Sequence, residues 1–144
     1  GDFNGDGLAD YIVAAPYMDI GTRTDAGSVF IVFGTGTLDA INTDTIVNEG
    51  RGIRLDGPIA GALLGYSVSA AGDVNGDGYS DVVMSAPLAD VSGRTQAGKT
   101  YVLFGGAAPQ TIDLATVNLA APAGPRRAQA PCPVASTAHR ESRL

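Results

Sequence analysis

A long internal repeat constrains the fold of this 144-residue chain more than any other feature. The segment GDFNGDGLADYIVAAPYMD at residues 1–19 recurs as GDVNGDGYSDVVMSAPLAD at residues 72–90, and we call the displacement from Gly1 to Gly72 the repeat offset. The copies stay in phase without a gap as far as Phe33-Gly34 and Phe104-Gly105, and 16 of the 34 aligned positions are identical. Self-similarity at a long, fixed spacing indicates a series of like structural units.

Each unit carries the signals of short strands. The apolar runs at residues 11–15 and 82–86 both stop at a proline, which cannot donate a hydrogen bond to a ladder. Four further strands are expected, at residues 28–33, 52–55, 65–71 and 99–104. Short strands in a long repeat predict an all-β fold with β-propeller blades of antiparallel strands. The alternative is a β-sandwich that contains two unrelated hairpins.

The composition excludes several function classes. Of the 15 acidic residues 13 are Asp, which favours turns and oxygen-ligand sites, and 20 residues are Gly. A single Cys and a single His exclude a disulfide framework, a cysteine zinc site and histidine clusters. A net charge of -6 predicts no nucleic-acid binding. Because no apolar run approaches about 18 residues, we expect no membrane span in this chain.

The pattern Asp-x-Asn-x-Asp-Gly-x-x-Asp occurs once in each unit and predicts a metal site. Two carboxylates about 4 Å apart repel by about 1 kcal/mol in water and by about 4 kcal/mol at an effective dielectric near 20. A fold that gathers them needs a cation, and oxygen donors alone favour Ca²⁺. The expected ligands, with backbone carbonyls at Leu8 and Tyr79, are Asp2, Asn4, Asp6, Leu8 and Asp10, and Asp73, Asn75, Asp77, Tyr79 and Asp81.

These loops have two other interpretations. The first is an EF-hand, which is rejected because an apolar strand follows Asp10 in place of a helix and a twelfth-position Glu. The second is a metal-free hairpin turn, in which the Asn-Gly and Asp-Gly pairs only supply left-handed residues. This second interpretation stays open.

Together these motifs resemble FG-GAP repeats, the blades of the integrin α-subunit β-propeller and of its bacterial relatives, and the chain looks like the bacterial type. The resemblance covers about residues 1–106 and rests on the GDxNGDGxxD loops, the following Ala-Pro and the final Phe-Gly. It departs from the family where the Gly of Gly-Ala-Pro is Ala14 or Ser85. It implies four-stranded blades, with calcium in the turn between the first two strands.

The resemblance also implies a face for ligands. Contacts are expected from the end opposite the calcium loops, where residues 17–26 and 88–97 should lie. Arg23 and Arg94 occupy equivalent positions there. They are interpreted as ligand contacts, or as the more common kinds of arginine at a loop tip, which are solvated or paired to a nearby acid, here Asp25 or Asp90.

Three segments are expected along the chain. Residues 1–50 form a first FG-GAP unit, incomplete at its N-terminus, and residues 51–116 form a second. Residues 117–144 form an Ala/Pro/Arg-rich tail of charge +3, against -9 for the rest, and we expect it to be disordered or foreign sequence. The propeller is therefore expected to be a fragment of a larger ring.

These features predict a calcium-binding propeller fragment of a secreted or surface protein that serves adhesion or ligand binding, with structural calcium. The expected partners are a protein or glycan ligand and the remaining blades of the same propeller. We expect no enzyme and no catalytic or cofactor-binding residues, because the only Cys and His lie in the tail. The alternatives are an accessory propeller of a larger secreted hydrolase or phospholipase, and a purely structural array without a ligand.

Overall fold

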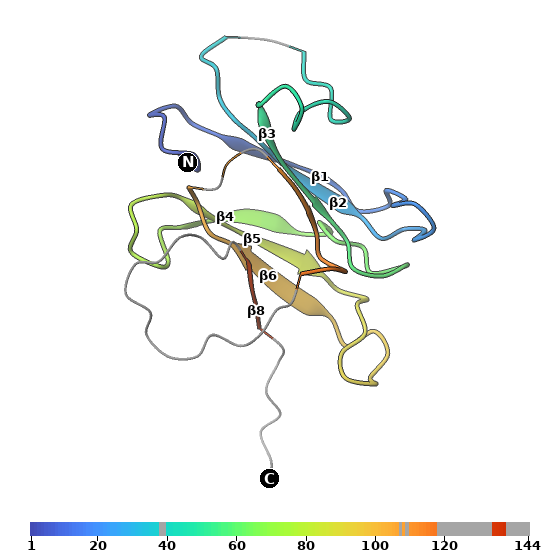
Figure 1. Cartoon of the computed structure of the whole chain (residues 1–144). Coiled ribbons are helices and arrows are strands. Elements are labelled where there is room, and N and C mark those ends of the chain that lie inside the picture. Colours follow the sequence, from blue (N-terminus) through green and yellow to red (C-terminus); the bar gives the residue numbers. More distant parts are fainter. Residues whose placement is uncertain (38–39, 107, 109, 118–133, 138–144) are drawn as a thin grey trace.

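Two four-stranded β-sheets make up the protein (Figure 1). The computed structural model describes residues 1–37, 40–106, 108 and 110–117, together with the backbone of residues 134–137. The first sheet has the order β1 (Tyr11–Ala15), β2 (Ser28–Val32), β3 (Gly52–Asp56) and β7 (Thr111–Asp113). The second has the order β4 (Val68–Gly72), β5 (Asp81–Ala86), β6 (Lys99–Leu103) and β8 (Val134–Thr137). The predicted all-β fold is confirmed.

The sequence repeat is also a repeat of strand register. β1 pairs with β2 antiparallel from Tyr11↔Val32 to Ala15↔Ser28. β5 pairs with β6 antiparallel in the same register, with every partner displaced by the repeat offset. β7 differs, because it joins β3 in parallel. β4 pairs with β5, and within the described residues the first sheet has no strand in the corresponding place beside β1.

The two sheets stack through opposite faces. The face of the first sheet that carries Val29 and Ile31 shares one core with Val82 and Met84 of the second sheet. By the repeat offset, Val82 and Met84 correspond to Tyr11 and Val13, which point to the other face of the first sheet. Stacking is therefore head to tail, as in a ring of like blades, and the fold is that of a propeller fragment.

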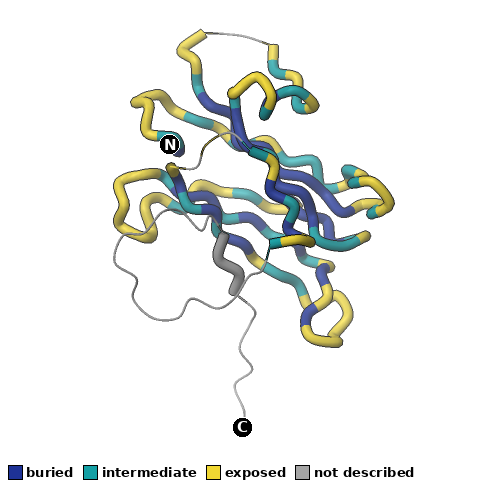
Figure 2. The backbone as a smooth tube through the Cα atoms, in the orientation of Figure 1, coloured by how far each residue is buried: buried dark blue, intermediate teal, exposed yellow. Residues whose placement is uncertain are grey.

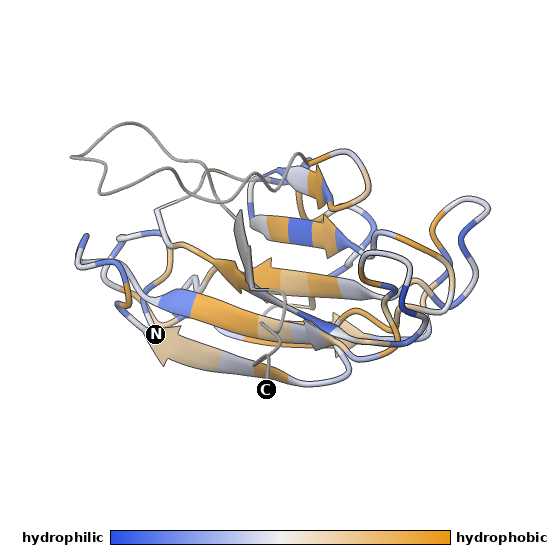
Figure 3. Cartoon of the chain, turned by 90° about the horizontal axis from the view of Figure 1, so that it is seen from below, coloured by the Kyte–Doolittle hydropathy of each residue, from blue (hydrophilic) through white to orange (hydrophobic). Residues whose placement is uncertain are grey.

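Burial follows this arrangement (Figure 2). Val82 and Met84 are 4% and 1% exposed, whereas their counterparts Tyr11 and Val13 are 47% and 38% exposed. Apolar residues are concentrated in the strands, and polar residues in the connecting loops (Figure 3). The outer face of the first sheet thus exposes apolar side chains, whereas the equivalent side chains of the second sheet are buried.

A smaller core covers part of that outer face. Phe30 and Val32 of β2 pack against Ile46, which lies in the turn-rich segment after residue 42. All five residues of β2 are therefore buried, one face against the second sheet and the other against this segment.

The predicted tail falls largely outside the described residues. Apart from Val117, only the backbone at Val134–Thr137 is described there, as β8 on β6. β8 pairs antiparallel with β6 as β3 pairs with β2, so both sheets carry a strand at this place.

Candidate functional site

Both predicted loops have the same self-bonded geometry. In the first loop, side-chain oxygens accept backbone N–H groups two to five residues later, at 2.7–3.0 Å. These bonds run from Gly5 and Gly7 to Asp2, from Asp6 to Asn4, and from Leu8 to Asp6. The same bonds recur at the equivalent positions of the second loop, at 2.7–3.0 Å, with Asp73, Asn75 and Asp77 as acceptors. Two independent stretches of sequence therefore build one conformation.

The structure brings together the middle ligands of each predicted set. The Asn4 side-chain amide donates to Asp6 Oδ2 at 2.9 Å, and the Asn75 amide donates to Asp77 Oδ2 at 2.8 Å. In the described part of the chain, no three Asp, Glu, His or Cys side chains gather in a group that could hold a metal ion. The side-chain oxygens of each loop are thus hydrogen-bonded to backbone N–H groups of the same loop.

The last acid of each loop turns away from the others and bonds to the end of a distant strand. Asp81 Oδ2 accepts the N–H of Val74 and Oδ1 accepts the N–H of Gly105, both at 2.8 Å. Asp10 makes the equivalent bonds to Phe3 at 2.7 Å and to Gly34 at 2.9 Å. These carboxylates fasten each loop to the Phe-Gly that follows the next strand.

The bond from the carboxylate explains why the second residue of each Phe-Gly pair is glycine. From the sequence alone, this glycine indicated only the end of a strand. A Cβ on Gly105 would lie 2.7 Å from the carbonyl oxygen of Ser80 and closer still to the Cβ of Tyr79. A Cβ on Gly34 would collide with the carbonyl oxygen of Ala9. The close approach that lets the carboxylate reach the glycine N–H leaves no room for a side chain.

The two loops also contact each other across the seam between the sheets. Ser80 N–H donates to the Asp2 carbonyl at 2.9 Å, and Gly106 N–H donates to the Phe3 carbonyl at 2.6 Å. The ring of Tyr79 lies so close to Gly5 that a Cβ on residue 5 would collide with it. The loops are therefore parts of one surface at one end of the molecule, on the left in Figure 1.

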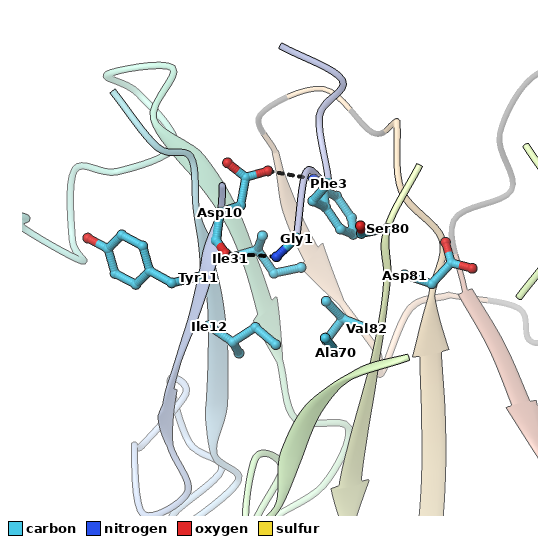
Figure 4. A pocket seen from close by; sticks show the side chains of 10 residues that line it. All are labelled: Gly1, Phe3, Asp10, Tyr11, Ile12, Ile31, Ala70, Ser80, Asp81 and Val82. Atoms are coloured by element: carbon cyan, nitrogen blue, oxygen red, sulfur yellow. Dashed lines mark hydrogen bonds between the residues drawn. The ribbon is translucent and has the colours of Figure 1, made fainter. Parts of the chain in front are cut away.

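A cavity of about 190 Å³ lies beside this seam (Figure 4). Its walls are largely apolar, from Phe3, Ile12, Ile31 and Val82, and the carboxyl groups at its rim belong to Asp10 and Asp81. Both carboxyl groups are held by backbone N–H groups. The absence of catalytic residues stays a prediction.

The donor sets fit a hard cation by their chemistry. They contain only carboxylate, amide and carbonyl oxygens, and a carboxylate oxygen that accepts one N–H keeps a second lone pair. Backbone N–H bonds, chiefly that from Gly78, hold the pKa of Asp73 below its ordinary value, so this carboxyl is a charged acceptor at neutral pH. Asp2, Asn4 and Asp6, and in the second loop Asp73, Asn75 and Asp77, would hold Ca²⁺, which would supply countercharge and fix the turn. Asp10 and Asp81 are already engaged by the N–H groups of distant strand ends.

The interpretation of Arg23 as a partner of Asp25 is wrong, and its interpretation as a ligand contact stays a prediction. Its guanidinium forms a two-bond ion pair with Asp113, at 2.8 and 2.7 Å, and also donates to the Gly57 carbonyl. Asp113 lies 90 residues away in sequence, which is why local reasoning missed it. A pairing of Arg94 with Asp90 stays a prediction.

The stacked repeat sheets and paired acidic loops define a class, the repeat β-propellers with acidic loops between strands. A family model of the FG-GAP repeat matches residues 1–32 and 64–103, which is half of the chain. The chain belongs to the FG-GAP repeat family.

Its relatives include integrin α subunits and a phospholipase. The chain is 39% identical over 89 residues to integrin alpha-PS5 of Drosophila melanogaster, covering 61% of this chain and 8% of that protein. It is 34% identical over 108 residues to integrin alpha-PS2 of the same species, covering 72% and 7%. It is 36% identical over 95 residues to phosphatidylinositol-glycan-specific phospholipase D of Rattus norvegicus, covering 65% and 10%. The chain thus spans a tenth or less of these animal proteins, and they lend no support to a bacterial type.

No helix in the described part of the chain is long and apolar enough to cross a membrane.

Proposed function

We propose that this chain is part of a calcium-binding FG-GAP propeller that serves ligand binding or adhesion in a secreted or surface protein. The observation that carries the proposal is the duplicate loop, in which both copies have the same donor spacing and the same hydrogen bonds. A turn needs few acids to fold, yet both copies keep three Asp and one Asn while neighbouring residues differ. Selection for cation ligands accounts for that retention.

Calcium here would be structural. It would neutralise the clustered carboxylates and hold the loop that meets the neighbouring sheet, so its binding would add directly to folding. Extracellular calcium modules commonly bind at about 10⁻⁴–10⁻³ M, which matches the millimolar calcium outside cells. We expect the same affinity range here, and for that reason we place the protein outside the cell.

The opposite end of the strands is the proposed ligand surface. The loops at residues 17–26 and 88–97 fold alike, because Asp25 N–H donates to Asp19 and Gln96 N–H donates to Asp90, at 2.9 and 2.8 Å. Tyr17 and Tyr66 near these loops are 65% and 62% exposed. Exposed tyrosines on rigid loops favour contact with a protein or glycan.

The remaining blades of the ring are the second proposed partner. Tyr11 and Val13 are exposed at positions whose counterparts, Val82 and Met84, are buried between the sheets. A further sheet stacked in the same head-to-tail manner would cover them.

A second candidate is an accessory propeller attached to a secreted hydrolase. It is favoured by the 36% identity to a phosphatidylinositol-glycan-specific phospholipase D. Sequencing the coding region on both sides separates the two candidates, because only the second requires a catalytic domain in the same protein.

Ligand binding is tested with arrays of glycans and extracellular proteins, probed with the full-length protein in calcium and in chelator. We expect binding in calcium, and about a tenfold loss when Tyr17 and Tyr66 are both changed to Ser, since buried tyrosines dominate many interfaces. Val74→Ser is the matched control, because Val74 is 57% exposed in the acidic loop at the other end. Equal losses in both variants, or no bound ligand, would contradict the proposed surface.

A further inference from the structure

The chain crosses between the sheets after β6. It leaves the second sheet and then forms β7 on the outer edge of the first, beside β3 (Figure 1). Arg54 N–H donates to the Gln110 carbonyl and Leu114 N–H donates to the Asp56 carbonyl, both at 3.0 Å. Residues 110–117 therefore belong to the second unit in sequence and to the first sheet in space.

Side chains on this segment fasten it at two points. Ile112 and Leu114 are buried in the core that the two sheets share. Asp113 receives both arms of the Arg23 guanidinium, and the same guanidinium donates to the carbonyl of Gly57, just after β3. A two-bond arginine–carboxylate pair fixes orientation as well as distance.

The first unit carries the same segment. Asn42 Oδ1 accepts the N–H of Asp44 at 3.0 Å, and Asp113 Oδ1, at the equivalent position of the second unit, accepts the N–H of Ala115 at 3.0 Å. The carbonyls of Asn42 and Asp113 also accept N–H groups from Thr45 and Thr116, at 3.2 and 3.0 Å. The repeat thus extends past the Phe-Gly pairs into a turn that neither sequence copy made evident.

We propose that residues 110–117 form a latch that ties an FG-GAP sheet to the sheet before it, and that residues 41–46 are the same latch for a preceding FG-GAP sheet. The partner that fits residues 41–46 has an outer strand with an unpaired edge, like β3. It also has a hydrogen-bond donor at the position equivalent to Arg23. The inference goes beyond the proposed function and does not depend on calcium.

A double-mutant cycle in the whole chain tests the latch. Asp113→Asn keeps the turn, since Asn42 makes it in the first unit, and removes the charge together with one of the two oxygens that accept from Arg23. We expect Asp113→Asn and Arg23→Gln each to lower the folding equilibrium constant about threefold to tenfold in urea titrations. The double variant should lose no more than Arg23→Gln alone, which also removes the bond to the Gly57 carbonyl. Additive losses would overturn the proposal. If Arg23→Gln does not fold, Arg23→Lys replaces it, with a smaller loss expected.

Hydrogen exchange separates a latch from general stabilisation. In Asp113→Asn we expect the Leu114 and Arg54 amides to exchange at least five times faster relative to amides of the β5–β6 ladder. Equal acceleration of both groups would contradict a latch. Asn42→Asp is the matched control and is expected to change stability less than twofold, because the described chain places no sheet before the first. A gain as large as the loss in Asp113→Asn would overturn the role of the ion pair.

The latch also predicts a dependence on pH. The hydrogen bonds from Arg23 hold the pKa of Asp113 below its ordinary value, so its contribution is complete above the unfolded pKa near 4 and is lost as the pH falls through the folded pKa. Arg23 faces this carboxyl. Asp56 is the strand partner of Asp113, raises the pKa of Arg23 by its charge, and pairs with Arg54; all three side chains remain in the Asn variant. The stability gap between wild type and Asp113→Asn should therefore close as the pH falls below the unfolded pKa near 4 and through the lower folded pKa. A gap that is unchanged at low pH would contradict the pairing.

Discussion

Replacing Asp81 with Ala is expected to lower the free energy of unfolding by about 3–4 kcal/mol, because the substitution removes two hydrogen bonds to a charged group. The Asp81 side chain is fully buried, and its loss leaves the N–H groups of Val74 and Gly105 without an acceptor. A hydrogen bond to a charged group contributes about 1.5–3 kcal/mol, and two are lost together. Urea unfolding measured in chelator checks the result, because these bonds do not involve a cation.

Asp10→Ala is the matched control for that change. Asp10 makes the equivalent bonds to Phe3 and Gly34, but its carboxylate is only partly buried, so its hydrogen bonds contribute less than those of the fully buried Asp81. We expect a loss about half as large. A loss at Asp10 that equals or exceeds the loss at Asp81 would show that burial of the carboxylate does not set the effect.

Replacing Gly105 with Ala is expected to destabilise the protein by at least about 3 kcal/mol, through overpacking together with a lost hydrogen bond. The added Cβ meets the Ser80 carbonyl oxygen at 2.7 Å and the Phe3 carbonyl oxygen at 3.0 Å, besides the Cβ of Tyr79. These atoms belong to backbone or sit next to it, so they cannot move aside without opening the seam between the loops. Overpacking of this kind costs about 1–3 kcal/mol or more, and here the Asp81 bond is lost as well.

Gly36→Ala separates this steric effect from glycine's backbone freedom. Gly36 has φ +70°, and nothing lies within 4 Å of the position of an added Cβ. Its replacement should lose only about 1–2 kcal/mol, the penalty for a left-handed residue. Melting temperatures of the two variants, measured side by side, check the difference. Similar losses would refute the close approach at Gly105.

The strands and acidic loops were predictable from sequence because their determinants are local. Alternating or β-branched runs that end at Pro16 and Pro87 predicted β1 and β5 to within a residue. The spacing of the Asp and Asn residues likewise predicted two equivalent turns, and the structure shows them as equivalent.

The contacts between units were not predictable in the same way. β7 has only three residues, with no apolar run to mark it, and its parallel pairing with β3 depends on the stacking of two sheets. The Arg23–Asp113 pair likewise joins residues that only the tertiary fold brings together. One signal for the second copy of this segment was present in the sequence. Ile41 and Ile112 occupy equivalent positions of the two units, as do Thr45 and Thr116.

Calcium-competed terbium luminescence tests the central claim most directly, since Tyr79 lies within the second loop and its ring covers Gly5 of the first. We predict terbium emission on tyrosine excitation, its displacement by calcium at about 10⁻⁴–10⁻³ M, and a much weaker signal in Tyr79→Phe. Asp6→Asn combined with Asp77→Asn, which keeps the acceptors for Leu8 and Tyr79 N–H, should abolish it. No calcium-displaceable emission from the wild-type chain, or full emission from that double variant, would contradict cation binding at these loops.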